Sequence, residues 1–175
     1  TLADDRPQIE KDYFHREELM GEEAYQYTED LSYGVRYLPD AMTNQLRRHL
    51  DFAGSFRRVE RAEFDSDLSF DKLKKKIRAL RGSVDLVMSG KIAHFYGYDD
   101  GNPLPRSIDA HCQVIDIVFV STRSLKPVFK TSVSVKVQEK ESDRPGNQYD
   151  HALETMRLAF NDLVVKISKG KIRKK

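Results

Sequence analysis

The sequence predicts an α+β fold: a single mixed sheet with a long antiparallel three-strand meander and helices packed on one face. Two apolar stripes with helical spacing end at Gly54 and Gly82, which predicts two helices. Three long segments rich in β-branched and aromatic residues then follow one another, separated by turn sequences only. A last helical stripe closes the chain. The expected order is strand, helix, strand, helix, strand, strand, strand, helix.

The composition bounds the class of protein. The chain has 175 residues, 39% hydrophobic and 33% charged, with a net charge of +2. This length suits one domain with its own core, and the balanced charge selects neither nucleic acid nor membrane as a partner. Its one cysteine, Cys112, excludes an intrachain disulfide, and no apolar run reaches the length of a transmembrane helix. Because the sequence begins at Thr1 without methionine, we expect a mature or trimmed protein, for which removal of a targeting segment is one explanation.

Three regions are expected along the chain. Residues 1–30 form an acidic arm rich in aromatic residues, including Tyr25 and Tyr27. Residues 31–168 form the α+β domain, and residues 169–175 form a basic tail. The arm shows no sustained periodicity, so we expect an irregular segment that packs on the domain through its aromatics. The alternative is a docking tail that becomes ordered on a partner.

The first half of the domain alternates strands and helices. A weak strand is expected over Leu31–Tyr37, and a helix then begins near Pro39 and ends before Gly54. Residues 55–64 alternate weakly and are expected to form a strand. The second helix precedes Gly82. The helical stripes comprise Met42, Leu46 and Leu50 in the first helix, and Phe70, Leu73, Ile77 and Leu80 in the second.

The second half contains the meander and the final helix. The three strands are expected over Val84–Tyr98, Ile108–Ser121 and Val128–Gln138. Gly90 is expected to mark a bulge or a close approach in the first of them. The last strand alternates strictly, so one of its faces should be buried and the other wet. The final helix is expected from about residue 148 to 168, with the stripe Leu153, Met156, Phe160, Leu163 and Ile167.

Catalytic motifs are missing from the sequence. There is no G-x-S-x-G elbow and no P-loop, so we expect no enzyme activity and no cofactor. Cys112 lies inside a strand and is expected to be a buried, unreactive thiol. His94 and His111 lie on strands expected to be neighbours, and a metal site there would need Asp109 or Asp116 as a third ligand. The simpler interpretation is two histidines on a sheet face, with no metal.

The chain resembles a group of bacterial envelope lipoproteins over residues 35–165. These are the auxiliary lipoproteins of ABC transport systems and the GNA-type lipoproteins, which are similar to the amino-terminal domain of the Tol translocation protein and to the curli-secretion and penicillin-binding-protein-activator lipoproteins. The matching positions are Leu38, Pro39, Leu46, Phe56, Val59, Asp85, Val87, Gly90 and Ile92. The resemblance implies a non-enzymatic periplasmic domain, anchored to the outer membrane by a lipid on a cysteine that precedes this sequence.

The expected function is therefore that of a protein-binding adaptor in an envelope transport or assembly complex, with no nucleic-acid partner. A small-ligand or lipid binder, with a pocket between the meander and the final helix, is the alternative. A hydrolase or metal enzyme built on the two histidines is a third hypothesis. The candidate binding residues for the adaptor are Arg47, Arg48, Tyr96, Tyr98, Tyr25 and Tyr27.

Overall fold

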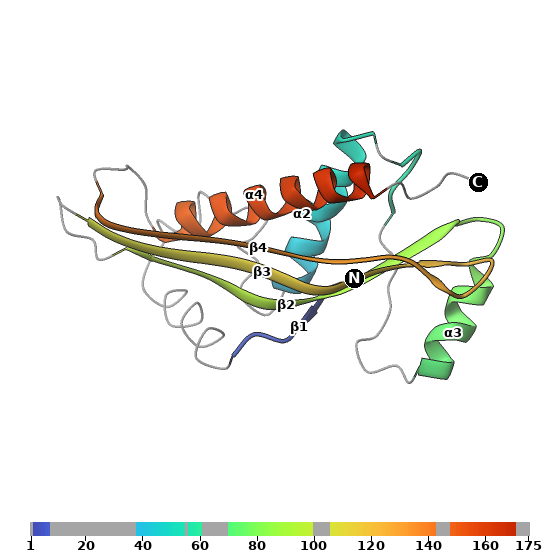
Figure 1. Ribbon diagram of the computed structural model, residues 1–175. Helices are drawn as coiled ribbons and strands as arrows, with labels where there is room; N and C mark the ends of the chain where they lie inside the picture. The colour runs from blue at the N-terminus through green and yellow to red at the C-terminus, as the bar shows by residue number, and fades with distance from the viewer. Residues whose placement is uncertain are drawn as a thin grey trace.

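The fold consists of one four-stranded sheet and the helices beside it (Figure 1). The computed structural model describes residues 2–7, 38–54, 56–60, 70–99, 106–142 and 148–170. The strands are β1 (Leu2–Asp4), β2 (Leu86–Asp99), β3 (Arg106–Ser121) and β4 (Pro127–Ser142). The helices are α2 (Leu38–Phe52), α3 (Phe70–Ala79) and α4 (Gln148–Lys169). Of these helices, none is both long and apolar enough to cross a membrane.

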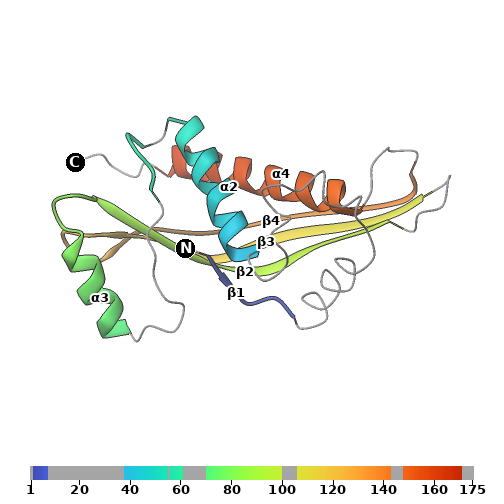
Figure 2. The ribbon, with the colours of Figure 1, turned by 180° about the vertical axis from the view of Figure 1, so that it is seen from behind.

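The predicted α+β class and mixed sheet are confirmed. The strands lie in the order β1-β2-β3-β4, with β2, β3 and β4 forming the antiparallel meander and β1 pairing parallel to β2. Helix α4 packs across β2, β3 and β4, while α2 packs on β1 and α4. In both views α3 lies on the opposite side of the sheet from α4, near one end of the meander (Figures 1 and 2). The helices on the predicted face are therefore α2 and α4.

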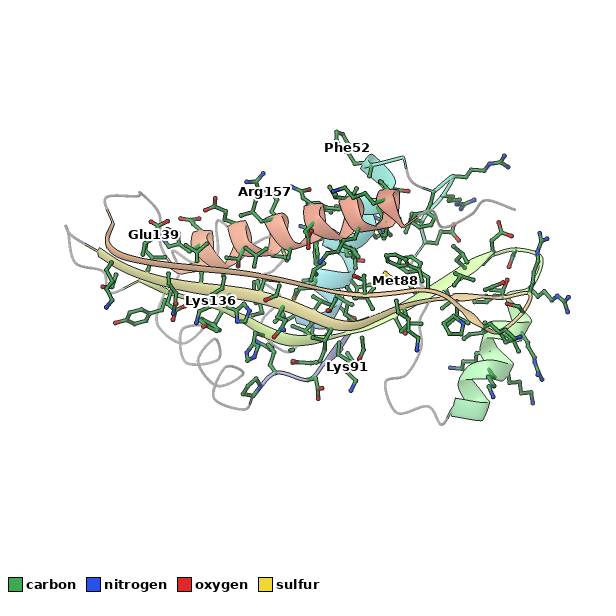
Figure 3. All side chains as sticks on the ribbon, viewed as in Figure 1. Phe52, Met88, Lys91, Lys136, Glu139 and Arg157 are labelled. Atoms are coloured by element: carbon green, nitrogen blue, oxygen red, sulfur yellow. The ribbon has the colours of Figure 1, made fainter. Side chains whose placement is uncertain are left out.

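The strict alternation predicted for the last strand is confirmed. Val133 is buried, and the other odd-numbered positions from Phe129 to Val137 are partly buried beneath α4. The even-numbered positions between them are exposed. Lys136 and Glu139 accordingly lie on opposite sides of the sheet in Figure 3. Cys112, Val114, Met156, Phe160 and Leu163 belong to the same buried cluster as Val133, so the core lies between the meander and α4.

Gly90 marks both a bulge and a close approach, as predicted. It pairs with Leu2 of β1, and a Cβ at this position would lie 3.1 Å from Leu2 Cδ2 and 3.3 Å from Ile117 Cγ1. The register between β2 and β3 shifts here, because β3 contains one more residue than β2 between the flanking pairs. The register between β3 and β4 shifts at the same place, between Val114 and Ile117. Asp116, with φ of 51°, lies in this bulge.

The predicted helix ends are confirmed. Gly54 follows α2 with φ of 61°, and Gly82 follows α3 with φ of 102°. Both residues adopt the left-handed backbone that glycine accepts without steric cost. The sequence signal was sufficient here because the preference is local to one residue.

The strand predicted over residues 55–64 is wrong for the part that the structure describes. Residues 56–60 contain no strand. Phe56 instead stacks on Phe119, with ring centroids 5.8 Å apart, and the Val59 N–H donates to Asp51 Oδ1 at 3.2 Å. The segment is therefore held by a ring contact and a side-chain acceptor rather than by a ladder. Residues 61–69 lie outside the described residues.

The beginning of the predicted arm belongs to the domain. Leu2 is 1% exposed, and its N–H donates to Thr43 Oγ1 of α2 at 3.0 Å. Residues 2–4 form β1, so the prediction of an irregular arm from residue 1 onward is wrong for these three residues. The rest of the arm, the strand predicted over Leu31–Tyr37 and the basic tail from residue 171 lie outside the described residues.

Candidate functional site

The candidate site is a set of polar and aromatic side chains on the face of the meander opposite α4. The register places Tyr98, Asp109 and Gln138 in one row across the three strands. Tyr96, His111 and Lys136 form the next row, and His94, Gln113 and Ser134 form the third. We call these nine residues the cross-strand array. Figure 3 shows Lys136 on this side of the sheet, with α4 on the other.

Asp109 is the centre of the array's hydrogen bonds. The Tyr96 hydroxyl donates to its Oδ1 at 3.3 Å, and Gln138 Nε2 donates to its Oδ2 at 3.2 Å. Lys136 Nζ lies 3.8 Å from Oδ1. One carboxylate thus links side chains from all three strands, which fixes their positions relative to one another.

The two histidines meet across β2 and β3, as predicted. Their rings stack with centroids 4.8 Å apart and an interplanar angle of 18°. Tyr96 presents its ring to His111 edge-on at 5.9 Å, and His111 Nε2 lies 2.9 Å from Ser134 Oγ. The stacked rings are therefore continuous with the hydrogen bonds around Asp109.

This geometry does not provide the ligand set of the metal-enzyme hypothesis. Nearly parallel imidazole planes direct their nitrogen lone pairs side by side rather than toward a common point. Among the residues that the structure describes, no group of three or more His, Cys, Asp or Glu side chains could hold a metal ion. Of the two carboxylates considered, Asp109 lies in the array and Asp116 lies 3.9 Å from Lys91 Nζ. The described part of the site thus offers recognition groups and no metal ligand set.

The array is open to contact in its first two rows. Tyr98 is 48% exposed, and the side chains of Lys136 and Asp109 are 43% and 36% exposed. Tyrosine combines a broad apolar ring with a hydroxyl, which suits it to surfaces that exchange water for a partner. An ion pair with this exposure contributes little to stability. These exposed side chains are therefore available for contact with a partner.

The predicted binding residues divide into three groups. Tyr96 and Tyr98 lie together in the array. Arg47 and Arg48 lie on α2, which packs on β1 and α4, so they do not join the array. Arg47 Nη1 lies 3.7 Å from Asp51 Oδ2, an i, i+4 pair along the helix. Tyr25 and Tyr27 lie outside the described residues.

Sequence reasoning missed most of the array. Asp109 was considered only as a metal ligand, and Gln113, Ser134, Lys136 and Gln138 were not proposed as binding residues. The wet face of the last strand was visible in the alternation of its sequence. The register between the strands determines which residues of this face lie beside Tyr96. The alternation within a single strand does not specify that register.

Cys112 is buried at 0% exposure, and desolvation raises the pKa of its thiol to about 12. We expect Ellman's reagent at pH 8 to label the folded protein at least about a hundredfold more slowly than the urea-unfolded chain, because only the thiolate reacts. The raised pKa also means that the unfolded chain ionises first, so this thiol lowers the free energy of unfolding as the pH rises through the alkaline range. Fast labelling of the folded protein would contradict the burial.

Comparisons with known proteins leave the family open. No protein-family model matches the chain, and no curated protein matches it. The crystal structure of a neuraminyllactose-binding hemagglutinin homologue from Helicobacter pylori is similar at 14% sequence identity, over 99% of this chain and 82% of that chain. The TM-score is 0.36, a level at which the likeness carries no argument about function.

Proposed function

We propose that the chain is a non-enzymatic, protein-binding adaptor domain of the bacterial envelope, acting in a transport or assembly complex. The observation that carries the proposal is the cross-strand array. It gathers Tyr96, Tyr98 and two histidines on the sheet face that α4 does not cover. Tyrosine is among the residues that dominate the energetics of protein interfaces.

The array is also held in place before a partner arrives. Asp109 receives hydrogen bonds from Tyr96 and Gln138, and the histidine rings stack on each other. Side chains that are already ordered lose less conformational entropy on binding, so more of the contact energy remains as affinity. This favours a recognition surface over a chance collection of polar residues.

The periplasmic location and the lipid anchor are proposed from the sequence resemblance. Of its matching positions, Leu38, Leu46 and Ile92 are buried in the core, and Gly90 lies at the bulge beside β1. The resemblance therefore concerns residues that specify packing. The proposed lipid would be attached to a cysteine in a segment that precedes Thr1, as in the lipoproteins that the sequence resembles.

The small-ligand alternative would place a pocket between the meander and α4. That interface is occupied by Val114, Val133, Phe160 and Leu163, each at most 1% exposed and all members of one buried cluster. Space for a ligand there would require these side chains to move apart. Packing of this kind favours the adaptor.

The proposal is tested by site-specific photo-crosslinking in bacterial envelope. A photo-reactive residue at position 98 should crosslink to an envelope protein, whereas one at Leu158, on the exposed side of α4, should not. Tyr98→Ala and Asp109→Ala should each weaken capture of the crosslinked protein by at least about tenfold. Thermal melts of both variants serve as the control for folding.

Two outcomes would contradict the adaptor. In the first, position 158 crosslinks to the same protein while position 98 does not. In the second, both alanine variants fold and still capture the partner as well as the unmodified protein does. Either result would show that binding does not involve the cross-strand array.

A further inference from the structure

The outer edge of β4, which pairs with no other described strand, is unusually long. β4 spans 16 residues, and in the described sheet it pairs with β3 alone. Strands in globular proteins typically run to about five or six residues. An edge of this length carries a row of backbone donors and acceptors that can pair with another extended chain.

One contact identifies which backbone groups point outward. Lys166 Nζ, from α4, donates to the Ser132 carbonyl at 2.9 Å, so this carbonyl points away from β3. Backbone groups alternate in direction along a strand. The groups of Ser134, Lys136 and Gln138 therefore also point outward, since the register shift beside Ser132 comes from an extra residue in β3, and β4 pairs continuously from Val133 to Glu139.

The side chains beside this edge differ between the two faces of the sheet. Lys130, Lys136 and Lys140 are exposed on the face opposite α4. Lys130 and Lys140 form no ion pair with any residue that the structure describes. On the α4 side, Val133 is buried, and Val135 and Val137 are only partly covered. A strand added here would meet positive charge on one face and apolar side chains on the other.

A second copy of the chain fits this edge poorly. An antiparallel β4–β4 pair would bring two sets of these lysines together on the same face, and like charges on opposed strands are destabilising. Lysine on an edge strand is a common means of preventing such self-association. The same charges attract a strand of opposite sign.

We propose that the β4 edge binds an extended segment of a partner protein in which acidic residues alternate with apolar ones. The segment would add a fifth strand to the described sheet. Its acidic side chains would face Lys130, Lys136 and Lys140, and its apolar side chains would face Val135 and Val137. Backbone hydrogen bonds supply the affinity in this mode of recognition, and the alternating side chains supply the specificity. This inference rests on the proposed adaptor function and gives the partner a chemistry.

The test uses a capped nine-residue peptide of alternating glutamate and valine, its lysine–valine analogue, and a glutamate–valine peptide with N-methylated backbone. Fluorescence anisotropy should show binding of the first, with the other two at least about tenfold weaker. Ser134→Pro removes an outward N–H and should weaken binding at least about tenfold, because proline is tolerated on an edge but cannot donate. Leu158→Ala, on the exposed side of α4 and outside both β4 and the cross-strand array, is the control and should bind within about twofold of the unmodified chain.

A charge-reversal variant covers the case in which Ser134→Pro fails to fold. Lys130→Glu combined with Lys140→Glu should transfer the preference to the lysine–valine peptide. The inference is overturned if the glutamate–valine peptide does not bind, if the N-methylated peptide binds equally well, or if the charge reversal leaves the preference unchanged. It is also overturned if the chain forms a dimer that Ser134→Pro dissociates, since a second copy would then occupy the edge. Peptide binding needs no envelope partner, so its failure leaves the crosslinking result at position 98 intact.

Discussion

Replacing Phe160 with alanine should lower the free energy of unfolding by about 3–5 kcal/mol. Phe160 is 0% exposed on α4, and its ring packs edge-on to His49 of α2 at 5.6 Å. The substitution removes a large apolar group from the buried cluster that α2, α4 and the meander share. Urea denaturation followed by circular dichroism measures the loss.

Leu158→Ala is the matched control on the same helix. Leu158 is 37% exposed, so its truncation should change the free energy of unfolding by no more than about 0.5–1 kcal/mol. Equal decreases in the free energy of unfolding for the two variants would mean that the inner side of α4 contributes no more to stability than its outer side does. That result would contradict the position of the core.

Replacing Asp4 with alanine should cost about 3 kcal/mol, because it leaves the Arg6 guanidinium buried without its counter-charge. The Arg6 side chain is 0% exposed. Its Nε donates to Asp4 Oδ1 at 2.9 Å, and Nη2 donates to Oδ2 at 3.0 Å. Among the residues that the structure describes, the buried Nη1 has no hydrogen-bond partner. Urea denaturation of the variant measures the cost.

The double variant Asp4→Leu with Arg6→Met distinguishes the net contribution of the ion pair from the cost of leaving one of its charges uncompensated. Replacing both charges by apolar side chains removes the unsatisfied donor as well, so most of the stability lost in Asp4→Ala should return. Together with the single variants Asp4→Leu and Arg6→Met, the double variant completes a double-mutant cycle that gives the coupling energy of the pair. A double variant less stable than Asp4→Ala would contradict the view that the uncompensated charge is the cause of the loss.

The sequence predicted the elements whose signal is periodic and long. β4 alternates along its whole central part, and α4 carries a stripe over its full length, so packing and local preference agree at every position. Helices α2 and α3 were predicted by their stripes and by the glycines that follow them. These elements make up most of the described fold.

The two segments that were predicted wrongly from the sequence have a common physical cause. β1 has three residues, too few to show a period, and its strand depends on a contact with Gly90 that lies far away in the sequence. Residues 56–60 contain apolar positions of the strand type, yet Phe56 is used in a stack on Phe119. Tertiary contacts overrode the local pattern in both places.

The candidate site was predicted only in part for a related reason. Tyr96 and Tyr98 could be proposed because aromatic residues near a strand end are often exposed. The central position of Asp109 requires knowing that it lies opposite Tyr98 and Gln138. That register depends on the bulge at Asp116 and on the second register shift between Ile92 and His94, and neither is specified by the alternation of any one strand.

The bulge at Asp116 has a consequence for how this protein can evolve. Val114 and Ile117 both lie in the core, although they are three positions apart, so the extra residue restores the phase of the alternation along β3. Loss of one residue here would turn either Ile117 and Phe119 or Cys112 and Val114 away from α4. Adding or removing two residues in β3 would therefore keep its side chains on their present faces. A single insertion or deletion would turn every side chain on one side of the change to the opposite face of the sheet.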